Sequence, residues 1–317
     1  MSSVTFGVVA MILVGVSWIV WGYVAGVAPR RNLNMGLMVA GSAAMAIVIC
    51  LAAGALLYGL NSRGVVLHKE LYPIFPVLNK GSLIVMGFVV LGGIFNFAQL
   101  QFMSKAMKYG PNGIIWSIVQ AGFIVPFALG IICFGEKMSW AFAAAITLVI
   151  ASLVLFAVTA DNSSKGHWLM FALFSFFSTC MCQSMQYIPS NLAAADGVSS
   201  LWRTFSYFVG LFLGFVIACC FSRKMRQDTV ALVKNKYTWL YALLIDVVEI
   251  FTCTCLFYPG MDALANSKIG AISTQLMTAS GIVAFELYAV LLLKEKRNKW
   301  QITALLLCLA SIAVICF

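Results

Sequence analysis

The sequence predicts an all-α polytopic membrane protein in which ten transmembrane helices form two inverted five-helix repeats. Three observations carry this prediction. Apolar residues make up 62% of the 317 residues and charged residues only 9%, whereas a soluble domain is about one-quarter charged. Apolar runs of about 20 residues, long enough to cross a bilayer, recur along the chain. The two halves of the chain also resemble each other at a nearly constant offset.

The apolar runs are separated by short polar segments. Each run is expected to be helical, because lipid offers the backbone no hydrogen-bond partner. The first run has no basic segment before it and no clear cleavage site, and it is longer than the apolar part of a signal peptide, so it is interpreted as a span. The predicted spans are 4–28, 35–60, 81–105, 112–134, 139–160, 167–188, 199–221, 238–262, 269–293 and 299–317.

Short motifs recur between the halves. Glu136, in a Glu-Lys pair before the fifth span, matches Glu295 before the tenth, 159 residues later, and Pro29 matches Pro189 at an offset of 160. Each half holds five spans, an odd number, so the second half must enter the membrane in the opposite direction. Inverted repeats of this kind are typical of secondary transporters. The alternative interpretation is that any two apolar helices look alike.

The repeat boundary and the charge distribution predict a topology. The first five-helix repeat is expected in residues 1–160 and the inverted repeat in residues 161–317. Of the 20 Lys and Arg residues, 14 fall on one side of the predicted bilayer. The positive-inside rule makes that side cytoplasmic. The predicted location is the cell membrane (the inner membrane in a bacterium), with both termini on the non-cytoplasmic side.

Composition also argues against several classes. The formal net charge of +10 arises from short clusters between apolar runs, a pattern explained by topology and lipid headgroups and not by nucleic acid. The ten cysteines lie mostly within apolar runs, and their Cys-x-Cys pairs point about 200° apart on a helix, so they are interpreted as packing residues. No nucleophile–base pair, phosphate-binding glycine loop or metal site is recognisable. The sequence therefore predicts no enzyme and no cofactor.

Two stretches and a turn motif support a family resemblance. The stretches are TFGVVAMILVGVSWIVWGYVAGVAPRR and GGIFNFAQLQFMSKAMKYGPNGIIWSIVQ, and a GEK or KEK turn precedes the fifth span of each half. Together they resemble the drug/metabolite transporter superfamily and, within it, the glucose/ribose porter and L-rhamnose–proton symporter branch. The resemblance covers nearly the whole chain. It implies uptake of a sugar or related small solute driven by a cation gradient, although the superfamily also contains exporters of amino acids, amines and drugs.

Candidate substrate-binding residues are the polar side chains within spans 3 and 4. Asn96 and Gln99 share one face of span 3, and Asn112, Trp116 and Gln120 form a stripe at i, i+4 and i+8 in span 4. Amides donate and accept hydrogen bonds, and an indole face packs on sugar C–H groups. The stripe therefore suits a polar, neutral ring compound. The alternative is hydrogen bonding between helices, about 0.6 kcal/mol per contact.

Further candidates come from spans 1, 6 and 9: Trp18, Gln183, Gln186 and Gln275. Other polar or aromatic residues are expected to have ordinary roles. Trp21 is assigned to the interfacial aromatic belt, Thr274 to helix capping, and Arg203 is expected to extend to the headgroups, with neutralisation of an inward carboxylate as its alternative.

Carboxylates within spans are the candidates for proton coupling. Asp246 and Glu249 stand three residues apart in LLIDVVEIF, and a charge near the bilayer centre costs about 2.5–3.5 kcal/mol. Glu249 ranks ahead of Asp246 because it lies deeper, and Glu286 in span 9 is the reserve. Glu136 is expected to form an interfacial ion pair with its neighbouring lysine, and Asp262 to face water.

The sequence therefore predicts a secondary active transporter for a small polar solute, with a sugar-like compound favoured and proton coupling expected. The partners would be that solute, a coupling proton and membrane lipid, with a monomer as the default. An exporter of amino acids, amines or drugs is the alternative within the class. A membrane protein without transport activity is the alternative outside it.

Overall fold

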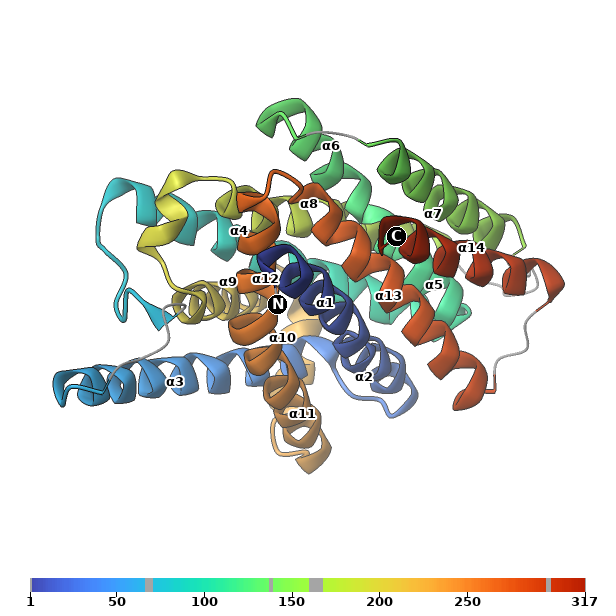
Figure 1. Ribbon diagram of the computed structural model, residues 1–317. Helices are drawn as coiled ribbons and strands as arrows, with labels where there is room; N and C mark the ends of the chain where they lie inside the picture. Colours follow the sequence, from blue (N-terminus) through green and yellow to red (C-terminus); the bar gives the residue numbers. More distant parts are fainter. Residues whose placement is uncertain (1, 66–70, 137–138, 160–167, 295–297, 317) are drawn as a thin grey trace.

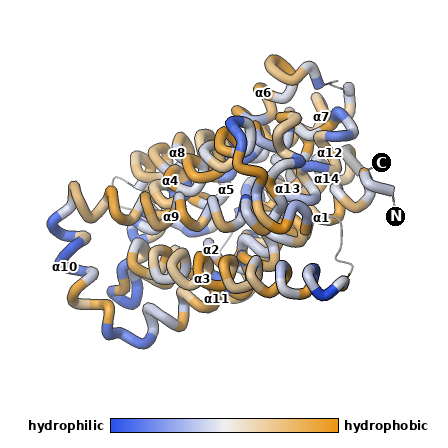
Figure 2. The backbone as a smooth tube through the Cα atoms, turned by 90° about the vertical axis from the view of Figure 1, so that its left-hand side faces the viewer, coloured by the Kyte–Doolittle hydropathy of each residue, from blue (hydrophilic) through white to orange (hydrophobic). Residues whose placement is uncertain are grey.

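The computed structural model describes residues 2–65, 71–136, 139–159, 168–294 and 298–316, and every element within these ranges is helical (Figure 1). Eight helical segments in these ranges are long and apolar enough to cross a membrane. Hydrophobic residues dominate the middles of the helices, and hydrophilic residues gather at turns (Figure 2). The predicted all-helical class is confirmed for the described residues, and the eight apolar helices are compatible with a multi-pass membrane protein.

The helices follow the predicted spans closely. In the first half they are α1 (Ser3–Ser17), α2 (Ile19–Arg30), α3 (Met35–Ser62), α4 (Lys80–Tyr109), α5 (Asn112–Gln120), η2 (Ala121–Phe123), α6 (Ile124–Phe134) and α7 (Trp140–Val158). In the second half they are α8 (Trp168–Ser190), η3 (Ala193–Gly197), α9 (Ser200–Phe221), α10 (Arg223–Leu232), α11 (Lys236–Thr252), η4 (Cys253–Phe257), α12 (Tyr258–Asn266), α13 (Ala271–Leu291) and α14 (Lys299–Cys316).

The fifth and tenth predicted spans correspond to α7 and α14, for which the apolar stretches found among the described residues are Trp140–Ser152 and Lys299–Ser311. These two helices pack against each other at one edge of the molecule (Figure 1). In the described residues the structure thus has eight helical segments of spanning length and two shorter apolar helices.

The structure contains a helix and several interruptions that the sequence did not predict. The polar helix α10 lies in the connection between α9 and α11, with Ser222 as its N-cap. Three predicted spans are interrupted: the first at Trp18, the fourth by the 3₁₀ turn η2, and the eighth by the π-helical turn η4. Turns of these kinds within helices often mark functional sites.

Glycines allow the closest helix contacts. A Cβ on Gly93 of α4 would overlap the backbone of α9 at Tyr207, and Gly210 of α9 meets α4 in the same way. Gly15 of α1 similarly lies against the backbone of α13 near Gly281. Small residues at such crossings let helix backbones approach each other in lipid. α4 and α13 are held at the centre of the bundle in this way.

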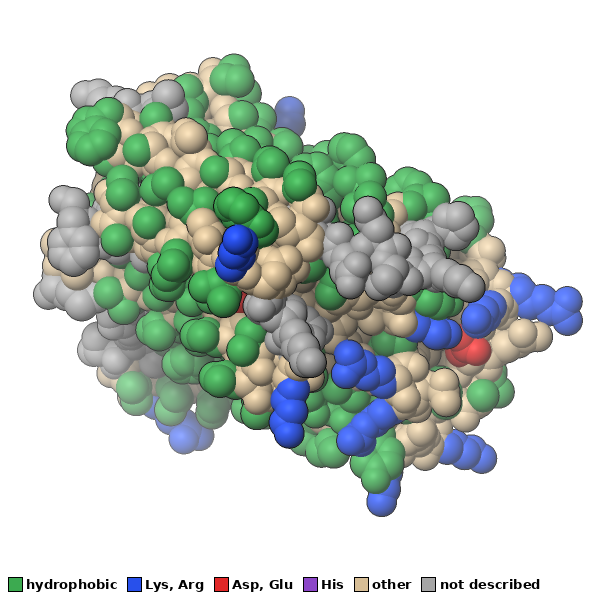
Figure 3. All heavy atoms as spheres, turned by 90° about the vertical axis from the view of Figure 1, so that its right-hand side faces the viewer, with side chains coloured by type: hydrophobic (Ala, Val, Ile, Leu, Met, Phe, Trp, Pro, Cys, Tyr) green, Lys and Arg blue, Asp and Glu red, His purple; other side chains and the backbone are tan. Residues whose placement is uncertain are grey.

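The bundle has two ends of different character. We call the end where α2, α4, α9 and α13 finish the basic end, and the opposite end, where α6, α8 and α12 finish and α9 and α13 begin, the Glu136 end. Lys and Arg side chains gather on part of the face seen in Figure 3. Of the Lys and Arg residues that the structure describes, those at the basic end are Arg30, Arg31, Lys105, Lys108, Arg223, Lys224, Arg226, Lys234, Lys236, Lys294 and Lys299.

Candidate functional site

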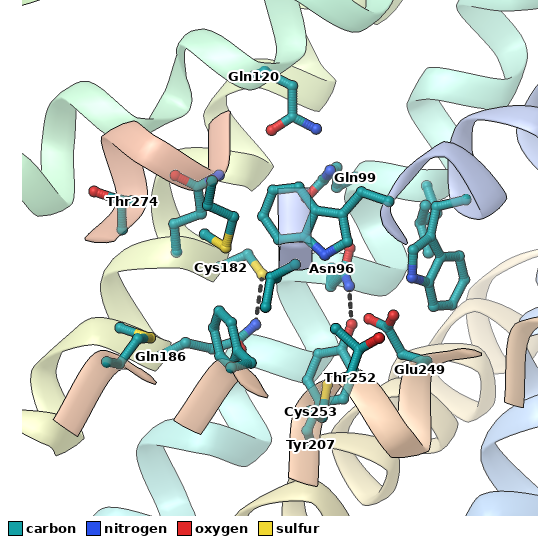
Figure 4. Close-up of a pocket in the computed structure, with 18 of the residues that line it drawn as sticks. Asn96, Gln99, Gln120, Cys182, Gln186, Tyr207, Glu249, Thr252, Cys253 and Thr274 are labelled. Carbon is teal, nitrogen blue, oxygen red and sulfur yellow. Dashed lines mark hydrogen bonds between the residues drawn. The ribbon is translucent and has the colours of Figure 1, made fainter. Parts of the chain in front are cut away.

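A cavity is lined mostly by residues from the inner parts of the helices (Figure 4 shows a close-up) and thus lies between the two ends of the bundle. About 670 Å³ of space in and around it is not occupied by protein atoms, including the part open to the surroundings. Its lining residues come from seven of the predicted spans: Val14, Trp18, Trp21, Asn96, Gln99, Leu100, Trp116, Gln120, Cys182, Gln183, Gln186, Tyr207, Glu249, Thr252, Cys253, Phe257, Met261, Thr274 and Met277.

The three interruptions border this cavity. Trp18 occupies the break between α1 and α2, Gln120 is the last residue of α5 before η2, and Cys253 and Phe257 are the first and last residues of η4. Broken spans free backbone groups at membrane depth, which is tolerated where the backbone is buried in protein or lines a cavity. Transporters commonly build their sites from such discontinuous helices.

The amides on the cavity wall fall into two groups. Some are engaged by the protein: Asn96 Nδ2 donates to the Tyr207 hydroxyl, and Gln186 Nε2 contacts Cys182 Sγ at 3.2 Å (Figure 4). By contrast, the side-chain oxygens of Gln120 and Gln183 are buried without a hydrogen-bond partner in the described residues. A buried polar atom without a partner costs free energy. These two oxygens are therefore available to a polar ligand.

Trp116 forms a fixed aromatic wall. Its indole Nε1 donates to the Gly281 carbonyl oxygen at 3.2 Å, and its ring stacks on Phe285 with centroids 4.8 Å apart. Both contacts tie α5 to α13. The indole is thus held in place at the cavity before any ligand arrives.

Among the described residues that line the cavity, Glu249 is the only charged one. Its side chain is buried, with the Trp21 indole and the Cys253 thiol within hydrogen-bonding range. The Asp246 carboxyl instead contacts α3, where Ser42 Oγ donates to Asp246 Oδ1 at 2.6 Å. The two carboxyls that the sequence placed on nearly one face therefore have different surroundings, and only Glu249 reaches the cavity.

The structure brings most, but not all, of the predicted site residues together. Trp18, Asn96, Gln99, Trp116, Gln120, Gln183, Gln186 and Glu249 lie on the cavity wall. Asn112, Gln275, Asp246 and Glu286 are also buried but lie outside the lining. For Asn112 the reason is its position at the first residue of α5, where its amide packs beside Gly26 of α2.

Arg203 does not extend to the headgroups as predicted. Its side chain is 3% exposed, and its Nη1 forms a salt bridge with Asp262 Oδ1 at 2.8 Å. Its other nitrogens donate to the carbonyl oxygens of Val198 and Ala195. The prediction that Asp262 faces water is likewise incomplete, because this carboxylate, 30% exposed, neutralises the buried guanidinium.

The ion pair predicted for Glu136 stays a prediction, because its neighbouring lysine, Lys137, lies outside the described residues. Glu136 is buried, accepts a hydrogen bond from the Tyr187 hydroxyl, and accepts another from the backbone N–H of Ala271 at 2.6 Å. The N-terminus of α13 attracts a carboxylate because its first N–H groups lack helical partners. The matching Glu295 lies outside the described residues.

Several lining residues were missed by the sequence analysis. Trp21 was assigned to the interfacial belt and Thr274 to capping, yet both line the cavity. Thr274 also donates to the Ala271 carbonyl oxygen, as a residue near a helix start does. Cys182 and Cys253 were interpreted as packing residues. The sequence did contain a sign that these two cysteines line the cavity. Cys182 is next to Gln183, and Cys253 lies one helical turn after Glu249.

Comparisons with known proteins give a likeness of fold only. No family model matches the chain, and no curated protein matches it. A solved crystal structure of a protein matches over 96% of each chain, with a TM-score of 0.59 and 16% sequence identity. At this identity the match shows that the overall helical arrangement occurs in a known structure, and it carries no information about activity.

The arrangement can bind a small polar molecule by hydrogen bonds and ring contacts. It offers unpartnered amide oxygens, a fixed indole and one carboxyl group on walls formed by separate helices. Within the described residues, no group of three or more His, Cys, Asp or Glu side chains is placed to hold a metal ion.

Proposed function

We propose that the chain is a secondary active transporter that moves a small polar solute through the central cavity by alternating access. The observation that carries the proposal is the cavity itself. It lies midway between the ends of the bundle, and three interrupted spans meet at its wall. A site of discontinuous helices near the midplane suits a solute that must be reached from each side in turn.

The proposed architecture is ten spans in two inverted repeats, residues 1–160 and 161–317. The packing supports it, because shifting the main helix contacts by five spans gives other helix contacts. α4 packs on α8 as α12 packs on α1, and α1 packs on α13 as α8 packs on α5. In the pairs α3–α9 and α7–α14 the two helices are five spans apart, so the same shift exchanges one helix for the other and leaves the pair unchanged. Such a relation is expected when two similar halves face each other.

Proton coupling is proposed at Glu249. This carboxyl is buried, lines the cavity, and could exchange a proton with either side as access alternates. Asp246 is one turn away but bonds to α3, so it would act only indirectly. Glu286 lies on α13 outside the lining and remains a reserve.

The favoured solute is a sugar or sugar-like compound. Gln120 and Gln183 present oxygens that hydroxyl groups can satisfy, and Trp116 offers a flat wall for a ring. The same resemblance that suggested a drug/metabolite transporter favours this substrate. The proposed transporter would catalyse no reaction and bind no cofactor.

An organic amine is the second candidate substrate. The observation that favours it is the lone carboxyl group of Glu249, with Trp18 and Trp21 on the same wall and no Lys, Arg or His among the lining residues. A carboxylate and aromatic faces together attract ammonium groups. The transporter would then be an exporter or exchanger of amines.

Location and orientation complete the proposal. Of the described Lys and Arg residues, 11 lie at the basic end and 4, Arg63, Lys80, Arg203 and Lys268, lie towards the Glu136 end. This asymmetry supports a cytoplasmic basic end in a cell membrane and both termini outside. A monomer is proposed, since the cavity is formed within one chain.

Uptake by purified protein in proteoliposomes under an imposed proton gradient tests the proposal. Accumulation or efflux of at least one compound from a panel of sugars, amino acids and amines is expected. Preference for neutral sugars over amines of equal size would select the first substrate class. No movement of any compound in either direction would contradict the transporter proposal.

A further inference from the structure

Glu136 joins three elements at the Glu136 end of the cavity. It follows α6 in the connection to α7, and its backbone N–H donates to the Gly130 carbonyl oxygen of α6 at 3.1 Å. Its carboxylate is shared between α8, through the Tyr187 hydroxyl, and α13, through the Ala271 N–H. A single side chain from residues 1–160 therefore fixes the ends of two helices that belong to residues 161–317.

Two glycines leave room for the Glu136 carboxylate and its partner Tyr187. A Cβ on Gly270 would lie 2.9 Å from Glu136 Oε1, and a Cβ on Gly130 would lie 2.6 Å from the Tyr187 hydroxyl. Gly135, just before Glu136, has a positive φ of 63° that ends α6 and turns the chain towards α13. Larger residues at the first two positions would push the bonded groups apart. The contact is thus closely fitted and not a chance approach of exposed groups.

Both helices that Glu136 holds carry cavity residues close to the contact. Gln186 and Gln183 of α8 lie one residue and about one turn before Tyr187, and Thr274 of α13 lies about one turn after Ala271. A movement that separated Glu136 from these partners would displace the same parts of α8 and α13 that form the wall. The geometry couples the contact to access at this end.

We infer that Glu136 is a positioning residue for transport, which holds the Glu136 end of the cavity closed, and that this end opens when its hydrogen bonds to Tyr187 and Ala271 break. The inference rests on the proposed transport function. It adds a residue outside the cavity that controls from which side the solute enters.

The native cysteines allow a direct test. Cys182 and Cys253 line the cavity, whereas Cys50 is buried in α3 outside the lining. Sealed vesicles of each orientation, carrying the full chain, would be treated with a membrane-impermeant thiol reagent. Mass spectrometry would then give the labelling rate of each cysteine.

Two variants weaken the contact. Tyr187→Phe removes one donor, and Glu136→Gln removes the charge that strengthens both hydrogen bonds and leaves a single amide oxygen as acceptor. Each is expected to raise labelling of Cys182 and Cys253 roughly tenfold from the side of the Glu136 end, as loss of a hydrogen bond to a charged group allows. Tyr258→Phe is the matched control, because the Tyr258 hydroxyl is also buried but has no hydrogen-bond partner in the described residues.

The outcomes separate a gate from a general loosening. Equal increases at Cys50, unchanged rates at all three cysteines, or increases from the opposite side would overturn the inference. Labelling does not require solute movement. An increase confined to the cavity cysteines would therefore support the gate even if the uptake assay failed, and normal uptake with unchanged labelling would refute the gate alone.

Discussion

The cavity lies between two ends that are packed by different kinds of contact. Towards the basic end, aromatic rings form a chain across four helices. Trp116 stacks on Phe285 at 4.8 Å, Phe285 meets Tyr288 at 5.3 Å, and Tyr23 contacts both Tyr288 and Tyr241 at 6.0 Å. Each of these pairs adds about 0.5–1.5 kcal/mol beyond burial and tolerates a range of ring angles.

At the Glu136 end, ring contacts such as Phe134–Tyr187 at 5.8 Å are accompanied by ionic and directional contacts. Glu136 accepts hydrogen bonds from Tyr187 and Ala271, and the Arg203–Asp262 salt bridge joins α9 to α12. Hydrogen bonds to charged groups contribute about 1.5–3 kcal/mol each and weaken steeply when misaligned. Ring contacts can slide and re-form, but these contacts are either made or broken. The difference suggests that the Glu136 end switches between discrete states while the basic end adjusts gradually.

The largest expected effect concerns the carboxyl group between the two ends. Glu249→Gln should abolish proton-driven accumulation while solute exchange continues, because the amide keeps the shape but cannot titrate. Asp246→Asn should have a much smaller effect, since its carboxyl bonds to Ser42 and not to the cavity. Counterflow and gradient-driven uptake in proteoliposomes measure the two activities. If both variants still showed full pH-dependent accumulation, neither Glu249 nor Asp246 would be the proton-coupling residue.

The next effect tests the ionic character of the Glu136 end. Asp262→Ala leaves the Arg203 guanidinium buried without its counter-ion, which should lower the free energy of unfolding by about 3–5 kcal/mol. Arg203→Met should cost less, because it removes the buried charge and leaves the partly exposed Asp262 able to reach water. Thermal unfolding in one detergent compares the two. If Arg203→Met proved the more destabilising, the salt bridge would be secondary to the guanidinium's carbonyl contacts.

A smaller effect tests the aromatic contacts towards the basic end. A Cβ on Gly22 would lie 2.7 Å from Phe285 Cδ2, so Gly22→Ala should push this ring from Trp116 and cost about 1–3 kcal/mol, as overpacking does. Gly59→Ala is the control, because nothing lies within 4 Å of its Cβ position. Thermal unfolding and intrinsic tryptophan fluorescence report the change. Identical behaviour of the two variants would show that the ring chain absorbs a methyl group without strain.

The sequence predicted the positions of the long apolar helices well, because a length and an apolar composition are easily recognised in a sequence. It also located side chains such as Asn96, Gln99 and Gln120, since polar groups within spans tend to face a cavity or another helix. Periodicity did not distinguish Asp246 from Glu249. Two residues three positions apart point in directions that differ by only about 60° around a helix. Within that angle, Asp246 faces α3 and Glu249 faces the cavity.

Contacts between distant segments could not be predicted from the sequence. Arg203 and Asp262 are 59 residues apart, and Glu136 and Ala271 are 135 apart. No local pattern indicates such pairings. The interruptions were equally hidden: η4 consists of ordinary apolar and small residues, and its wider turn brings Cys253 and Phe257 to the wall through tertiary packing.

The smallest expected effect asks whether the wall between the two ends binds the solute at all. Gln120→Leu removes a cavity amide whose oxygen has no partner in the described residues, so solute affinity should fall about tenfold, as loss of one hydrogen bond allows. Gln275→Leu is the matched control, because this amide is also buried and unpartnered but lies outside the lining. It should leave affinity unchanged. Folding should be near normal in both variants, since leucine suits lipid and protein interiors alike, and the apparent Kd from a thermal-shift titration reports binding. If Gln120→Leu and Gln275→Leu behaved alike, the Gln120 amide would serve packing, and recognition would have to come from Glu249 and the tryptophans instead.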